Sequence, residues 1–281
     1  MALQGLHHPL FQSVILPLLL SLAVIGVLRT AAGPARAGAG VGLAVLAATI
    51  WLMGWPLPPA SALHKLPWIF AAGWLAGVAL DIVAASRSRR WLCLGLGWVA
   101  ASWWLGASSI GMAVGCAATG LLVVACLLQA PGDRADAVAA AVVASLGLAA
   151  VCFAAGSLAL FQLAVLLAAA LGGAGLWLWP RPRIHHGSAV MAVAAAGWLT
   201  IAQAALLLIA VQPRSLALLA LAFAVLPLLA RRWRSSVAAP LATALAAGLL
   251  AGGALMLQTA GPEIGGAAGE AGSGDPAYYG K

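Results

Sequence analysis

One carboxylate within the apolar part of this sequence could carry a proton or a cation. Asp81 is the only acidic residue inside an apolar segment, the segment 67–85. At about 1.5 Å per residue it lies roughly 20 Å along a helix counted from Trp68, in the last third of a hydrocarbon core. A carboxylate at that depth is costly and is by default a functional group, such as a proton or cation relay. The alternatives are a structural ion pair with an arginine in 87–90 and a cap at the membrane interface.

Three further side chains lie near the middle of the apolar segment 188–211. Thr200 and Gln203 are three residues apart and therefore share a helix face, and Trp198 precedes them. Because tryptophan usually lies at the membrane interface, a tryptophan at mid-depth is expected to face neighbouring helices. These side chains could line a substrate cavity. Alternatively, they join helices through hydrogen bonds worth about 0.6 kcal/mol each.

A proline-rich connection, 56–67, carries a histidine and a lysine side by side. Its four prolines make it stiff and prevent it from being helical throughout. His64 and Lys65 could therefore form a rigid lip that presents two polar groups to an anion, a lipid headgroup or a partner. The alternative is a lysine that extends its stem along apolar surface beside an interfacial Trp68.

Histidine and cysteine offer only a weak metal-binding signal. His7, His8 and His64 could converge on a metal or a haem edge, but no ligand spacing supports this, and interfacial anchoring is the simpler interpretation. The four cysteines are separated by intervals that match no metal or redox motif, so we expect them to pack as small apolar residues. No cofactor is predicted. The cysteines are Cys93, Cys116, Cys126 and Cys152.

Composition excludes several classes of protein. Of the 281 residues, 64% are hydrophobic and 7% are charged, whereas a soluble domain carries about 25% charged residues. This excludes a soluble enzyme, a nucleic-acid-binding domain and a disordered chain. The sequence contains no P-loop, GxSxG, HExxH or CxxC motif and no connection long enough to fold as a separate domain, so we predict no enzymatic activity.

Apolar runs predict an all-α, polytopic transmembrane bundle over residues 1–260, without a soluble domain. A spanning helix needs about 20 apolar residues, and ten segments meet or approach this length. The breaks after residue 106 and at 156–157 carry no charge, so eight or nine spans are also compatible with the sequence. The segments are 10–28, 37–55, 67–85, 91–106, 110–129, 137–155, 158–179, 188–211, 215–230 and 236–258.

Basic residues give the bundle an orientation. With ten spans, every second connection is arginine-rich, and the positive-inside rule makes that side cytoplasmic. The other side holds only Lys65, Arg214 and Lys281. Both termini are then periplasmic, and residues 261–281 form a flexible, Gly-rich periplasmic tail. The excess of arginine over lysine and the abundance of alanine are typical of a GC-rich bacterial genome, which indicates a bacterial inner membrane.

Small-residue motifs occur in three segments, at Gly73 and Gly77, Gly111 and Gly115, and Gly248 and Gly252. This spacing allows helices to approach closely. Ten spans would also permit two inverted halves of five, as in many transporters, but the halves show no convincing sequence similarity.

Three functions remain open. The first is a permease for a small solute or a lipid, with a cavity around the third and eighth segments and with Asp81 as a relay. The alternative is a non-catalytic subunit or assembly factor of a larger membrane complex, which fits the short loops and small-residue faces. The third is a haem- or metal-binding membrane protein that uses the histidines. The expected partners are the lipid bilayer and membrane proteins or further copies of the chain, and not nucleic acid.

Overall fold

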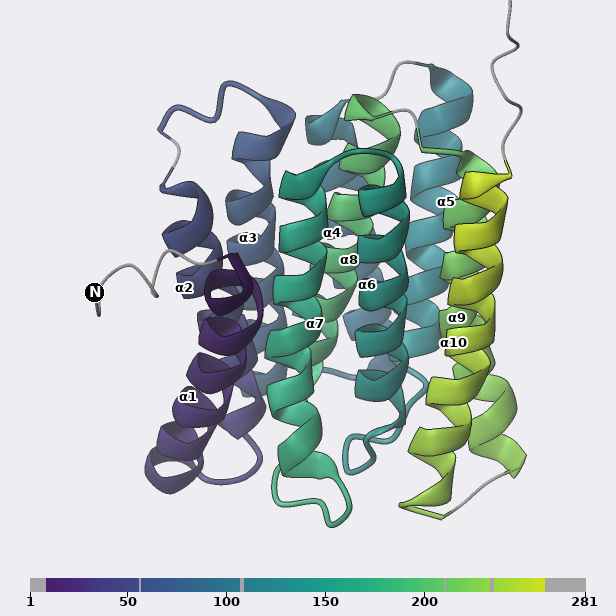
Figure 1. Ribbon diagram of the computed structural model, residues 1–281. Coiled ribbons are helices and arrows are strands. Elements are labelled where there is room, and N and C mark those ends of the chain that lie inside the picture. Colours follow the sequence, from purple (N-terminus) through teal and green to yellow (C-terminus); the bar gives the residue numbers. More distant parts are fainter. Residues whose placement is uncertain (1–8, 56, 107–108, 210, 233–234, 261–281) are drawn as a thin grey trace, which may run out of the picture.

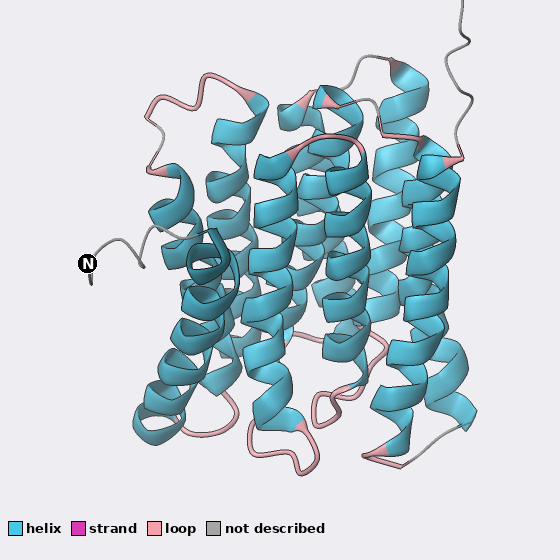
Figure 2. Cartoon of the chain, viewed as in Figure 1, coloured by secondary structure: helices cyan, strands magenta, loops and turns pink. Residues whose placement is uncertain are grey.

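The computed structural model describes residues 9–55, 57–106, 109–209, 211–232 and 235–260. Within these ranges the chain folds into ten α-helices and no strand, which confirms the all-α bundle (Figures 1 and 2). A π-helical turn, Phe11–Ile15, leads into the first helix, and a 3-10 turn, Ala37–Ala39, leads into the second. The helices are α1 Leu16–Ala32, α2 Gly40–Met53, α3 Ala62–Ile82, α4 Arg87–Leu105, α5 Ile110–Leu127, α6 Asp136–Ala154, α7 Leu158–Leu178, α8 Ser188–Leu208, α9 Pro213–Arg232 and α10 Ala238–Thr259.

Each predicted apolar segment corresponds to one helix, and each of the two uncharged breaks separates two helices. Gly106 (φ 100°) and Gly156 (φ 83°) take the left-handed conformation that glycine adopts without strain. A serine then caps each following helix: Ser109 Oγ accepts from the N–H of Met112, and Ser157 Oγ accepts from the N–H of Leu160. The predicted tail, 261–281, lies outside the described residues.

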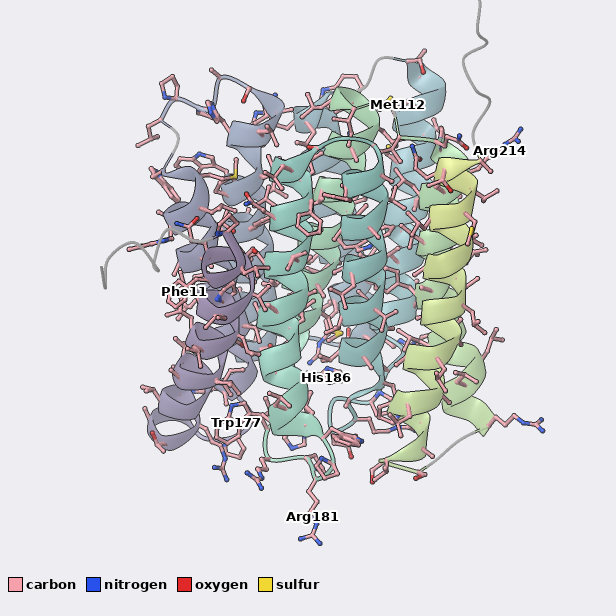
Figure 3. The ribbon with its side chains drawn as sticks, viewed as in Figure 1. Phe11, Met112, Trp177, Arg181, His186 and Arg214 are labelled. Carbon is pink, nitrogen blue, oxygen red and sulfur yellow. The ribbon has the colours of Figure 1, made fainter. Side chains whose placement is uncertain are left out.

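Length and composition make the chain a polytopic membrane protein. Among the described helices, seven are long and apolar enough to cross a membrane, and α2 and α9 are shorter apolar helices. The remaining helix, α4, begins with three arginines in its first turn. The connections that carry most arginines lie at one end of the bundle, the end at which Figure 3 shows Arg181, while Arg214 lies at the opposite end.

The bundle is built around α8, whose side chains are almost all buried. Helix α3 packs along it, and α2, α4, α5, α6 and α7 also contact it. Helices α9 and α10 cover one side of α6, whereas α1 packs on α2 and α7. Since α6 contacts α9 and α10 while its counterpart α1 has a different set of main neighbours, the two five-helix halves do not pack alike.

The contact between α3 and α8 depends on the first of the three glycine motifs. A β-carbon at Gly73 would lie 2.8 Å from the Cβ of Ala196, and one at Gly77 would lie 2.6 Å from the Cα of Ala189. Both glycines thus allow the backbones to approach closely. The other two motifs, on α5 and α10, have no heavy atom within 4 Å of where a β-carbon would stand.

Candidate functional site

A cavity of about 480 Å³ lies between α3, α4 and α8. Its lining is almost wholly apolar and contains no carboxylate, imidazole, ammonium or guanidinium group. Helix α3 contributes one face, from Trp68 to Ala76, and the small side chains of Ala192, Ala195 and Ala196 on α8 leave the space open. The cavity reaches the outside of the bundle at Cys93 and Gly97 of α4, which are exposed.

A second cavity, of about 620 Å³, lies between α4, α5, α8 and α9. It shares Trp98 and Leu199 with the first cavity, so these two side chains form the wall between them. The Trp98 indole donates a hydrogen bond of 3.0 Å to the carbonyl of Cys116. Gly120 makes room for the ring, because a β-carbon there would overlap it. The aromatic part of the wall between the two cavities, Trp98, is thus held by one hydrogen bond.

The polar residues predicted on α8 have different roles. The indole N–H of Trp198 donates to the carbonyl of Ala144 at 3.1 Å, and its ring meets Phe223 edge-on. Thr200 donates to the carbonyl of Ala196 on its own helix and lines neither cavity. Trp198 and Gln203 line the second cavity. The structure therefore brings two of the three predicted cavity residues to one cavity, and it places α3 and α8 around the other.

Gln203 closes the end of α4. Its amide nitrogen donates to the carbonyls of Ser102 and Gly106, both at 3.0 Å, where the helix has no further N–H to satisfy them. The side chain is 1% exposed, and its oxygen has no hydrogen-bond partner within the described part of the chain. This oxygen is a buried acceptor without a partner among the described residues, on a side chain that lines the second cavity.

Asp81 holds the beginning of α8. Its two carboxylate oxygens accept hydrogen bonds from the backbone N–H groups of Ser188 (2.7 Å) and Ala189 (3.0 Å). The negative charge also lies at the positive end of the α8 dipole. A side chain at Gly187 would overlap the carboxylate. The geometry is that of a cap supplied by a neighbouring helix, and the relay role stays a prediction.

His64 and Lys65 lie in the first turn of α3 and not in the preceding loop. The helix starts earlier than the sequence predicted, at Ala62, because Ser61 Oγ accepts from the N–H of His64 at 3.3 Å. Lys65 Nζ donates to the carbonyl of Trp104 at 2.7 Å and lies 5.6 Å from the centre of its ring. His64 is exposed. The predicted lip is therefore the first turn of α3, which Lys65 joins to the last turn of α4.

The histidine site cannot be assembled from the described residues. His7 and His8 lie outside the described ranges, and within these ranges no three His, Cys, Asp or Glu side chains are grouped to hold a metal ion. The four cysteines are free thiols. Two of them line the cavities, Cys93 the first and Cys116 the second.

Helix α4 contributes residues to the cavities that no sequence motif marks. Gly97, Trp98 and Ala101 all line the first cavity. The available signal was a glycine and an alanine four residues apart, which share a helix face. In a sequence with 33 glycines such pairs are common. Only the packing of α4 beside α8 shows that this pair lines a cavity.

The connection between α7 and α8 ties the arginine-rich end together. The N–H of His185 donates to the carbonyl of Pro34 (3.0 Å), and the N–H of His186 donates to that of Gly132 (2.8 Å). Three connections are thus joined at the entrance to α8, where Figure 3 shows His186. His186 is 4% exposed, whereas His185 is exposed.

Stability should fall in mild acid because of His186. Burial lowers the pKa of His186 below its ordinary 6.5 and outweighs the neighbouring backbone groups of Pro131 and Arg134 and the charge of Asp133, which all act to raise it. The unfolded chain then binds a proton more readily than the folded one, so this contribution is complete above pH 6.5 and is lost as the pH falls below it. Melting temperatures in detergent should therefore drop between neutral pH and about pH 5, and His186→Gln should flatten the drop. If the exposed control His185→Gln flattens it equally, His186 is not the cause.

A scan against models of known protein families finds no match, and a search of curated proteins finds no sequence similar enough to count as a relative. The class of protein is defined by the fold alone: a multi-pass helical membrane protein in contact with the lipid bilayer.

Proposed function

We propose that the protein is a permease for small apolar or amphiphilic molecules, lipids among them. The observation that carries this proposal is the pair of cavities on either side of Trp98 and Leu199. Together they extend from α3 to α9, and α8 lines both of them. A rotation of the Trp98 side chain, which breaks one hydrogen bond to Cys116, would join them.

The chemistry of the lining favours this class of solute. Neither cavity has a charged side chain in its wall, so a small ion or a sugar would meet few groups to replace its water. An apolar chain would stay in apolar surroundings when it moves from the bilayer into such a cavity. The exposed rim at Cys93 and Gly97 supports entry from the bilayer side.

The orientation belongs to the same proposal. The arginine-rich end faces the cytoplasm under the positive-inside rule, and both termini are then on the periplasmic side of a bacterial inner membrane. The hydrogen bonds from His185 and His186 to neighbouring connections support a closed cytoplasmic end. The Trp68 and Trp104 rim of the first cavity then belongs to the periplasmic half.

Flux in proteoliposomes tests the proposal. Purified protein is reconstituted in phosphatidylcholine vesicles that contain NBD-labelled lysophosphatidylcholine, and dithionite then destroys the label on the outer leaflet. We expect nearly complete loss of fluorescence with the protein and about half in protein-free vesicles, because lysolipid on the inner leaflet becomes accessible only through the protein. Equal loss in both samples would contradict a lysolipid permease.

One observation favours the second candidate function, a subunit of a larger complex. On α10, Gly248 and Gly252 face open space, and Leu245 and Leu249 beside them are 73% and 80% exposed. Such a face would accept another helix. Purification in a gentle detergent, followed by native mass spectrometry, distinguishes the two: stoichiometric foreign subunits support the complex, and a lone chain or homo-oligomer supports the permease.

A further inference from the structure

We infer that the cavity between α3, α4 and α8 binds a single-chain amphiphile with an anionic head, with the head at Lys65 and the chain along α3. This amphiphile would be the substrate class of the proposed permease. Its transport rests on the proposed function, whereas its binding is measured separately.

Lys65 extends the cavity-lining face of α3 by one helical turn. Trp68, Ala72 and Ala76 line the cavity and follow Lys65 at intervals of three and four residues, which place all four on one face of the helix. From Lys65 to Ala76 the helix rises about 16 Å. A molecule with its head at Lys65 could therefore lay an extended chain along this face.

The contact between Lys65 and Trp104 fixes the ammonium group at the rim of the cavity. Trp104 lines the cavity, and Lys65 Nζ reaches both its carbonyl (2.7 Å) and its ring. An ammonium group has three N–H donors, and Trp104 accepts from one of them. The other donors are available to an anion at the point where the apolar lining ends.

Protein carboxylates do not neutralise this charge in the described part of the chain. The acidic residues there are Asp81, Asp133 and Asp136. All three lie at the arginine-rich end: Asp81 in the last turn of α3, Asp133 in the connection after α5, and Asp136 at the start of α6. At the end that holds Lys65, the described residues contribute two cations, Lys65 and Arg214, and no anion. Because Lys65 is half-buried, a fixed anion gains more from it than from a fully hydrated lysine.

The walls of the cavity suit an alkyl chain. They are formed by alanine, glycine, leucine, isoleucine, valine, cysteine and tryptophan residues, and they enclose a volume of about 480 Å³. Since Cys93, Gly97 and Ala100 in the wall are exposed on the outside of the bundle, a chain can slide in from the bilayer without leaving an apolar environment.

Quenching of tryptophan fluorescence by a brominated amphiphile tests the inference. The protein in phosphatidylcholine nanodiscs is titrated with ω-bromoundecanoate at mildly alkaline pH and, separately, with the neutral ω-bromoundecanol. Bromine on the chain would quench Trp98 within the cavity. We expect the carboxylate to bind about tenfold more tightly than the alcohol, as a charge-assisted hydrogen bond allows. Lys65→Gln should abolish the difference, and Lys65→Arg should keep it.

Arg214→Gln is the matched control, because it removes the second cation that the described residues contribute to this end and Arg214 lines neither cavity. Equal affinity of acid and alcohol for the wild-type protein would overturn the inference, whatever the variants do. An equal effect of Arg214→Gln would also overturn the inference, because it would indicate a general surface potential. Full competition by acetate alone would overturn it too, because it would indicate a site for free anions. Binding of ω-bromoundecanoate without flux of NBD-labelled lysophosphatidylcholine in proteoliposomes would contradict a lysolipid permease and leave the binding site intact.

Discussion

Gly77→Ala should destabilise the protein by about 3 kcal/mol, the upper range for one methyl group forced into a packed interior. The new β-carbon would lie 2.6 Å from the Cα of Ala189 and 2.7 Å from the carbonyl oxygen of Ser188. Both are backbone atoms at the beginning of α8, so no rotation of a side chain can relieve the overlap. Helices α3 and α8 would have to move apart at the point where Asp81 caps α8.

Thermal unfolding in detergent measures this effect, with Gly248→Ala as the matched control. Both substitutions add one methyl group to a helical glycine of a GxxxG motif, but at Gly248 no heavy atom lies within 4 Å of the new carbon. The control should unfold at the wild-type temperature or slightly above it, because alanine favours the helix. Equal melting temperatures for the two variants would contradict the close contact between α3 and α8.

Asp81→Ala should cost a similar amount, about 3 kcal/mol, because two backbone N–H groups lose their acceptor. These are the N–H groups of Ser188 and Ala189 in the first turn of α8, and Ser188 is itself buried. Loss of the carboxylate also removes a favourable charge from the N-terminus of the helix. The melting temperature should fall strongly, and the exposed control Asp133→Ala should change it little.

Asp81→Asn distinguishes the cap from the relay. An asparagine side chain supplies one carbonyl oxygen and can still accept a hydrogen bond from α8, so a cap should be weakened but retained. Flux per folded molecule should then remain close to that of the wild type. A variant that is folded and stable but transports nothing would support the relay that the sequence suggested and would contradict a purely capping role.

The helices could be predicted from the sequence because each is an apolar run and the interruptions between runs contain charges, prolines or small polar residues. Even the uncharged breaks at 106 and 156 were visible as segment limits. The observed start of α3, Ala62, lies five residues before the predicted start at residue 67. The cap at Ser61 begins the helix there, and His64 and Lys65 therefore belong to the helix. Because of this local cap, His64 and Lys65 lie at a helix end and not in a loop.

The candidate site was only partly predictable, because it depends on contacts between distant segments. Asp81 was recognisable as a costly carboxylate, but its partners lie more than 100 residues away in the chain. No periodicity indicates that pairing. Similarly, Gln203 and Trp198 were visible as polar groups in an apolar segment, whereas the role of Trp98 follows only from the packing of α4 beside α5 and α8.

The most direct test of the proposed route is the flux of NBD-labelled lysophosphatidylcholine through Gly97→Leu. A β-carbon at Gly97 meets no heavy atom within 4 Å, so a leucine there can extend into the cavity between α3, α4 and α8 without distorting the backbone. Gly172→Leu on α7 is the control, because it adds the same side chain at a glycine that has equal space and lines neither cavity. We predict that Gly97→Leu lowers the flux at least about tenfold, while Gly172→Leu retains it and both variants keep the wild-type melting temperature. Wild-type flux through a folded Gly97→Leu variant would contradict the route.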